Sequence, residues 1–294
     1  MAQKILDNVT AAEEIPSISE ELVAKVRNHL TDCEEWLNQR FTPEIKPNRT
    51  SCASQVKFLD TPDYISYLLK QIPGQEQGSG MTLEIFEACM TAINTHGQRT
   101  MDGKTALVHT TKIEDGAARQ LTLEEILATA AHEMIHLKVE PIIVVENGMT
   151  IRRTGCKEIR ADHETGKVES RHVVMYEALT SILAIAASQP EISSFGEIIT
   201  AYNRKATTDD QPQHTALAAV CELLEAAGPD FNGLIKTIGK SYFNSDGENM
   251  FYIIKYIFPS AMGNILDTFI KASANNSLDE MVEAVNQIKQ SNLS

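Results

Sequence analysis

Residues 131–137 carry two histidines and a glutamate in the order His132-Glu133-x-x-His136. Four residues make about one turn of an α-helix, so both imidazoles project from the same helix face and can bind one metal ion. Glu133 follows the first histidine, where its carboxylate can take a proton from a water molecule on that metal. These residue types at this spacing predict a zinc-dependent hydrolytic site, with His132 and His136 as ligands and Glu133 as general base.

The residues before the motif predict the helix that it needs. Thr122-Leu123-Glu124-Glu125 has the spacing of a capping box, with Thr122 at the N-cap and Glu125 at the third helical position. Helix formers continue to Val139, and Pro141 ends the run. Apolar residues recur at helical spacing and predict one buried stripe, at Ile126, Leu127, Ala130, Met134 and Leu137.

Two histidines leave a zinc ion short of one protein ligand. The best candidate is Glu177, a solitary carboxylate in the apolar segment 172–183, which also has helical spacing. A buried carboxylate is costly unless it is paired or bound to a metal, which favours a ligand role. The alternative is a solvated glutamate near a helix start, and Asp162, His163 and His172 are weaker candidate ligands in a turn and a loop.

The motif and its surroundings resemble the gluzincin branch of the zinc metallopeptidases, and most of all its minimal members, the minigluzincins. The resemblance runs through Thr129–Leu137, a hairpin that begins at Ile151–Gly155, and Glu177–Thr180. It covers roughly residues 103–243. At one position, Lys138 stands where the extended signature of these peptidases has an apolar residue.

The resemblance implies a zincin-like catalytic core with one Zn²⁺ ion bound by His132, His136 and Glu177. It also implies an endopeptidase that hydrolyses a peptide or protein substrate, with Glu133 as general base. In this family a strand just before the metal helix edges the cleft and pairs with the substrate backbone. Residues 104–111 are therefore expected to form that edge strand, and an internal strand is the alternative.

A peptidase also needs a hydrogen-bond donor for the oxyanion of its tetrahedral intermediate. Tyrosine and histidine commonly supply it beside a zinc ion. Tyr202 is the predicted donor, and His214 and Tyr242 are the alternatives. Spacing alone does not choose among the three.

Two other interpretations of the motif are open. A zinc hydrolase of the peptide deformylase kind would use Cys89 as third ligand, and the His-Glu-Met-x-His-Leu run is similar to that family too. A non-catalytic helical interaction protein would instead keep a structural or vestigial zinc site, although structural sites normally have four protein ligands. Zinc content measured together with hydrolysis of casein separates the three interpretations.

The composition limits the class of protein and its partners. The chain has 294 residues, of which 43% are hydrophobic and 22% charged, as in ordinary globular proteins. A formal net charge of −14 argues against nucleic acid and anionic membranes as partners. No secretory signal or membrane-spanning apolar run is seen, and five scattered cysteines indicate free thiols, so a cytoplasmic location is expected.

The order of local signals predicts an α+β chain that is mainly helical with one β patch. The expected parts are a mobile tail at 1–16, an N-terminal helical region at 17–100, the zincin-like core at 101–243 and C-terminal helices at 244–294. Asn147-Gly148 predicts a hairpin with a two-residue turn.

The N-terminal region carries several signals of its own. A helix is expected from a Ser17 or Ser19 cap, a short helix from Pro62, and another from Thr82 that is closed by Gly97. Residues 74–80 are rich in glycine and predict a linker. Residues 1–73 are expected to lie near the metal cleft and modulate access to it. The alternative is that their apolar residues complete the hydrophobic core.

Overall fold

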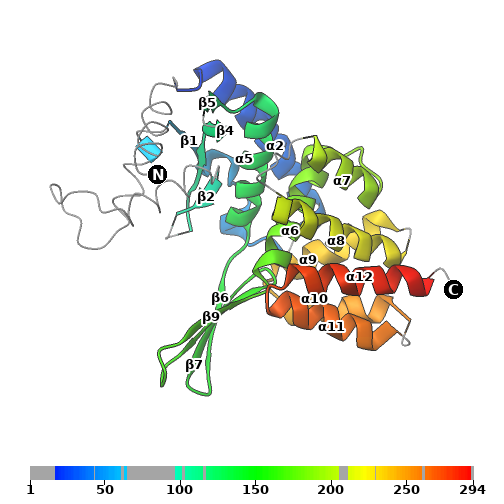
Figure 1. The fold of residues 1–294 in the computed structure, drawn as a ribbon. Helices are drawn as coiled ribbons and strands as arrows, with labels where there is room; N and C mark the ends of the chain where they lie inside the picture. The colour runs from blue at the N-terminus through cyan, green and yellow to red at the C-terminus, as the bar shows by residue number, and fades with distance from the viewer. Residues whose placement is uncertain are drawn as a thin grey trace. The chain divides into compact units, whose positions relative to one another are not determined.

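The described residues form nine α-helices and three small β-sheets (Figure 1). This confirms an α+β class that is mostly helical. The computed structural model describes residues 17–42, 44–60, 63–64, 97–100, 103–114, 117–204, 211–228, 230–259 and 262–292. The chain divides into two compact units: a first unit of Met1–Asp32 and Ser51–Leu137, and a second unit of Cys33–Thr50 and Lys138–Ser294.

Helix α2 (Glu20–Phe41) begins after Ser19, whose hydroxyl accepts a hydrogen bond of 3.2 Å from the Leu22 N–H. The predicted amphipathic helix and its cap are therefore confirmed. Four residues of its apolar stripe are fully buried, Val26, Leu30, Cys33 and Leu37, and Leu22 is half-buried. Two short 3-10 helices follow, η1 (Pro47–Arg49) and η2 (Ala53–Gln55). The burial of Val26, Leu30, Cys33 and Leu37 agrees with the alternative that the apolar residues of this region complete the hydrophobic core, and a role of residues 1–73 in access to the metal site stays a prediction.

The first unit contains a three-stranded sheet in the order β1-β3-β2. Its strands are β1 (Val56–Leu59), β2 (Gly97–Arg99) and β3 (Ala106–His109), with β1 parallel and β2 antiparallel to β3. All four residues of β3 are buried, and His109 stacks on Tyr64 with ring centroids 4.7 Å apart. The expectation of an edge strand at 104–111 is wrong, and the alternative of an internal strand is confirmed. The reason is that β1, from the N-terminal region, pairs along the second side of β3.

A second hairpin, β4 (Thr111–Glu114) and β5 (Ala117–Gln120), leads into helix α5 (Leu123–Lys138). The expectation that Gly97 closes a helix is wrong, because Gly97 is the first residue of β2 and does not have a positive φ. Several other expectations fall outside the described residues: the tail 1–16, the linker 74–80, the helix from Thr82, Cys89, and the helix from Pro62 apart from residues 63–64.

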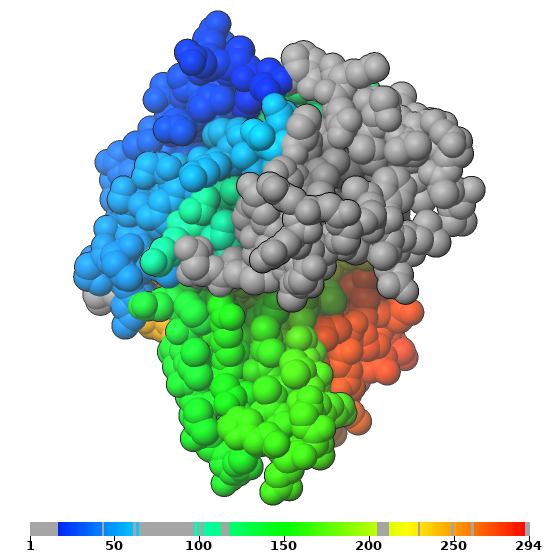
Figure 2. All heavy atoms as spheres, turned by 90° about the vertical axis from the view of Figure 1, so that its left-hand side faces the viewer, coloured from blue at the N-terminus to red at the C-terminus, as the bar shows by residue number. Residues whose placement is uncertain are grey.

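The second unit contains a four-stranded antiparallel sheet in the order β6-β7-β8-β9. The strands are β6 (Ile142–Glu146), β7 (Met149–Thr154), β8 (Lys157–Asp162) and β9 (Val168–Arg171). Asn147 and Gly148 join β6 to β7 with φ values of 48° and 74°, as a two-residue type I′ turn requires, so this prediction is confirmed. The sheet extends away from the helices of the second unit (Figure 1), and it forms the green surface low in Figure 2.

Seven helices follow the sheet in the second unit: α6 (Val173–Ser188), α7 (Phe195–Asn203), α8 (Gln211–Ala227), α9 (Phe231–Phe243), α10 (Gly247–Ile257), α11 (Gly263–Ala274) and α12 (Leu278–Asn292). Their apolar residues form its core, with Leu183 of α6, Val220 of α8 and Ile288 of α12 fully buried. In the part of the chain that the structure describes, no helix has the length and apolar character needed to cross a membrane.

Candidate metal centre

Helix α5 begins with the predicted capping box. The Thr122 hydroxyl accepts a hydrogen bond from the Glu125 N–H (3.3 Å), and the Glu125 carboxylate accepts one from the Thr122 N–H (2.7 Å). The two terminal guanidinium nitrogens of Arg119, Nη1 and Nη2, also donate to this carboxylate, at 2.8 and 2.7 Å. Partial burial alone would raise the pKa of Glu125, but the bonds from Arg119 and Thr122 outweigh it and lower this pKa to about 2.

The predicted apolar stripe anchors α5 in the protein core. Four of its five residues are fully buried, and they are Ile126, Ala130, Met134 and Leu137. This burial fixes the rotation of the helix about its axis, because each side chain has one direction relative to that axis. The histidine face of α5 therefore has a defined direction before any metal binds.

The two histidines of the motif meet on this face. Their Nε2 atoms are 3.0 Å apart, and the ring planes are nearly perpendicular, at 82°. One ligand atom from each of His132, Glu133 and His136 lies within 4.8 Å of the others. Glu133 and His136 are buried, with 6% and 8% of their surfaces exposed. Among the described residues this is the one set of three or more histidine, cysteine or acidic side chains with such spacing.

The nitrogen spacing fits a metal ion. Two nitrogens at about 2.0–2.1 Å from a tetrahedral zinc ion lie about 3.3 Å apart. The observed 3.0 Å between the Nε2 atoms needs an adjustment of only about 0.3 Å, within reach of small rotations of the two imidazoles. Imidazole nitrogens also suit zinc chemically, and a carboxylate beside them is what proton transfer requires. The residues present therefore fit the predicted ion.

Strand β2 approaches Glu133 at Gly97. A methyl group on Gly97 would lie 2.5 Å from both Cγ and Oε1 of Glu133, which is closer than a Cβ atom approaches non-bonded atoms in real structures. The sequence pattern missed this residue, because a glycine after a helical segment also has the pattern of a helix end. Only the tertiary contact distinguishes the two roles.

Glu177, the predicted third ligand, lies half-buried on α6 of the second unit. Burial and, to a smaller extent, the negative charge of Glu177 raise the pKa of Cys156 and Tyr242, which belong to the same unit. The apolar helix that the sequence predicted around Glu177 is confirmed. The role of Glu177 as a metal ligand stays a prediction.

His172 has a structural role in the second unit. Its ring Nδ1 is 2.9 Å from the Ser273 hydroxyl of α11, and its backbone N–H donates to the Ser273 backbone carbonyl. Its ring also packs on the ring of Phe251. Burial, the largest cause, lowers its pKa to about 4. The turn that follows α11 caps α6, because the Asn276 side chain accepts a hydrogen bond of 2.7 Å from the Val173 N–H. These contacts account for His172 without a metal.

The two remaining weak candidates shape the β8–β9 turn. One Asp162 carboxylate oxygen accepts hydrogen bonds from the Glu164 and Thr165 N–H groups, at 2.8 and 2.9 Å. Nε2 of His163 is 2.8 Å from the Thr150 hydroxyl. Both side chains are therefore engaged in a turn that the sequence predicted at this place.

The candidate oxyanion donors divide into two kinds. The rings of Tyr202 and His214, from α7 and α8, are stacked with their centroids 6.1 Å apart. Tyr242 is fully buried, with its hydroxyl 2.5 Å from that of Thr180, which donates to the Tyr176 carbonyl. Burial raises the pKa of Tyr242 well above 10. Tyr242 is thus part of the core, and Tyr202 as the oxyanion donor stays a prediction.

No family model, curated protein or solved structure matches this chain. The resemblance to the gluzincins therefore rests on the residues quoted above and on the geometry of α5.

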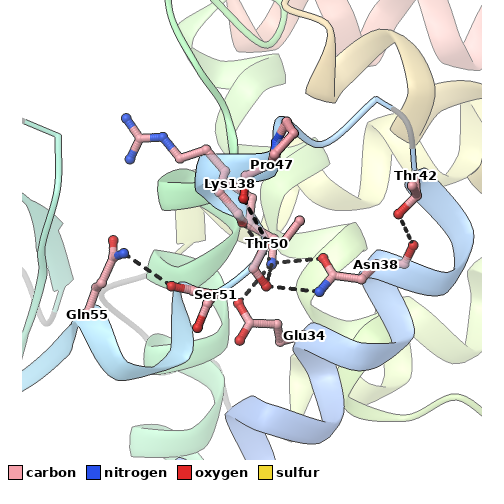
Figure 3. Close-up of polar contacts among 9 residues, drawn as sticks. Glu34, Asn38, Thr42, Pro47, Thr50, Ser51, Gln55 and Lys138 are labelled. Atoms are coloured by element: carbon pink, nitrogen blue, oxygen red, sulfur yellow. Dashed lines mark hydrogen bonds and ion pairs between the residues drawn. The ribbon is translucent and has the colours of Figure 1, made fainter.

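Lys138, the residue that departs from the family signature, is fully buried at the end of α5. Its ammonium group lies 2.9 Å from a Glu34 carboxylate oxygen and donates to Asn38 Oδ1 and to the carbonyls of Arg49 and Thr50, at 3.1–3.3 Å (Figure 3). All of these groups belong to the second unit. Position 138 is therefore buried, as the apolar residue of the family signature would be. Here it is occupied by a lysine whose charge is paired with Glu34.

Proposed function

We propose that the protein is a zinc-dependent peptidase, with two metal-binding histidines and the proton-transfer residue on α5. The observation that carries this proposal is the approach of two Nε2 atoms to 3.0 Å beside the buried carboxylate of Glu133. A structural histidine pair in a core has no need of an adjacent carboxylate. A hydrolytic zinc site needs both, because it must bind the ion and accept a proton from water.

Each residue has a distinct part in this proposal. His132 and His136 hold the ion through Nε2, and Glu177 is the proposed third ligand. The ion would supply positive charge that acidifies a water molecule and polarises the scissile carbonyl group. Glu133 accepts the proton of the attacking water and passes it to the leaving amine. Tyr202, stacked on His214, is the proposed hydrogen-bond donor to the oxyanion.

The substrate of this proposal is an extended peptide segment. In the described part of the sheet β2 pairs with β3 alone, and its first residue lies against Glu133. A peptide that adds to β2 as a further strand would place its backbone next to the general base. Strand addition uses main-chain hydrogen bonds, which gives binding that tolerates many sequences. In this proposal β2 takes the role that the resemblance to the gluzincins implied for residues 104–111.

The test is Glu133→Gln in the full chain. Glutamine keeps the size of the side chain and cannot accept the proton, so we expect zinc content to stay unchanged while casein hydrolysis falls by about 10²–10⁴-fold. Glu124→Gln is the matched control, because Glu124 is exposed on the same helix, outside the His-Glu-His cluster. It should leave both quantities unchanged.

Three outcomes would contradict this proposal. Turnover of Glu133→Gln at the wild-type rate would remove Glu133 from the mechanism. One zinc ion per chain without hydrolysis of any peptide would favour the non-catalytic interaction protein. Hydrolysis restricted to N-formyl peptides would favour the deformylase kind of enzyme.

A further inference from the structure

We infer that Gly97 is a positioning residue for Glu133: the missing side chain at the start of β2 is what lets the Glu133 carboxylate lie beside His132 and His136. The packing part of this inference stands on the structure of the first unit alone. Its catalytic part rests on the proposed function.

The contact between Gly97 and Glu133 is a steric one. The three atoms nearest to a methyl group on Gly97 would be Cγ, Oε1 and Cδ of Glu133, at 2.5, 2.5 and 2.7 Å. All three belong to one side chain and none to the backbone. A larger residue at this position therefore conflicts with the general base.

Backbone conformation does not explain a glycine here. The φ of Gly97 is not positive, so its backbone is open to any residue type. A glycine inside a strand weakens the strand, and it commonly marks a place where another group comes close to the backbone. The group that comes close to Gly97 is the Glu133 carboxylate.

Burial makes the conflict consequential. Glu133 is 6% exposed, so its carboxylate has little free space into which it can swing. A methyl group at position 97 must push the carboxylate away from its place, and the three atoms nearest to that methyl group all belong to Glu133 rather than to either imidazole of the motif. A general base acts only within hydrogen-bond reach of the proton that it takes. Displacement should therefore slow proton transfer and leave the histidines able to bind the ion.

The kinetic test is Gly97→Ala in the full chain. Because a misplacement of about 1 Å can cost about 10²-fold in rate, we expect kcat on a casein-derived peptide to fall by about that factor. The KM and the zinc content should stay at their wild-type values. Gly196→Ala is the matched control, since the nearest atom to its new methyl group would lie 4.0 Å away. A Gly97→Ala enzyme with unchanged kcat would overturn the catalytic part of the inference, and so would a variant that changes KM alone.

A second measurement needs no activity and keeps the inference separate from the proposed function. Glu133→Ala removes the three atoms that would lie nearest to the new methyl group. Gly97→Ala should therefore lower the melting temperature by at least about 2–4 °C more in the wild-type background than in the Glu133→Ala background. Gly97→Ala that folds only together with Glu133→Ala would also support the contact. An equal shift in both backgrounds, or failure to fold in both, would overturn it. An inactive wild-type protein would refute the peptidase proposal without affecting this result.

Discussion

Replacement of Glu34 by glutamine tests the most deeply buried charge in the described structure. The Lys138 side chain is fully buried, and the Glu34 carboxylate, 11% exposed, lies 2.9 Å from its ammonium group. Glutamine keeps the shape of the side chain and one hydrogen-bond acceptor, but it removes the negative charge. The Lys138 charge would then remain in a low-dielectric environment without a counter-charge.

The contacts around Lys138 set the magnitude of the loss. Breaking a buried ion pair by removing one partner costs about 3–5 kcal/mol of folding free energy. Three neutral acceptors would remain around the ammonium group, at 3.1–3.3 Å from Asn38 Oδ1 and the carbonyls of Arg49 and Thr50. These oxygens continue to solvate the charge. We therefore expect a loss at the lower end, about 3 kcal/mol.

Urea denaturation at pH 7, followed by circular dichroism, measures this loss. The matched control is Glu21→Gln on the same helix, where Glu21 pairs with Lys25 at 2.8 Å but the two side chains are 80% and 61% exposed. That variant should show no measurable loss, because water screens the pair. The double variant Glu34→Leu with Lys138→Met should recover part of the stability, since no buried charge remains. A Glu34→Gln variant as stable as the control would refute the buried charge at Lys138.

Three further predictions follow from single side chains. Glu177→Ala should weaken zinc binding at least about tenfold in a chelator competition titration, because the loss of a residue that only supports a metal ligand already costs about that much. Cys89→Ser should leave zinc binding unchanged. The reverse pattern would favour the deformylase kind of site. Burial alone would raise the pKa of Glu125, but hydrogen bonds from Arg119 and Thr122 lower it from 4.5 to about 2. The folding stability that these bonds contribute is therefore complete above pH 4.5 and is lost as the pH falls toward 2. The stability difference between wild type and Glu125→Gln, measured in urea, should therefore shrink on acidification, and a constant difference would contradict the assignment. Burial lowers the pKa of His172 from 6.5 to about 4, so the wild type should lose stability between pH 6.5 and pH 4, and His172→Asn should remove that part of the pH dependence.

Short-range signals predicted the parts of the structure that depend on neighbouring residues. The capping box of α5 joins residues three positions apart, and the Asn147-Gly148 turn needs two consecutive residues with positive φ. The His-Glu-x-x-His geometry is likewise a property of one helical turn. Such features need only local backbone geometry, which residue type largely determines.

Contacts between distant residues could not be predicted in the same way. Strand β3 acquires a parallel partner from β1, about 50 residues earlier, and Lys138 binds an Asn38 side chain 100 positions away. The cap of α6 comes from Asn276, 103 positions after Val173. Each of these pairings depends on the chain topology rather than on a local pattern. The edge-strand prediction failed for this reason. A strand is at an edge only when no other strand of the chain pairs along its second side, and a local pattern does not show that.

Gly97 shows how one residue type can satisfy two physical demands that a local pattern does not separate. A glycine at the C-terminal end of a helix is favoured because its backbone adopts a positive φ, and asparagine is tolerated at such a position for the same reason. A glycine at a close approach is favoured because it has no Cβ, and no other residue meets that condition. Gly97 has no positive φ, and the Glu133 side chain occupies the space that a Cβ would need. A helix-end role would therefore tolerate asparagine at position 97, whereas a close approach would exclude it. Only the close approach connects this glycine to the metal centre.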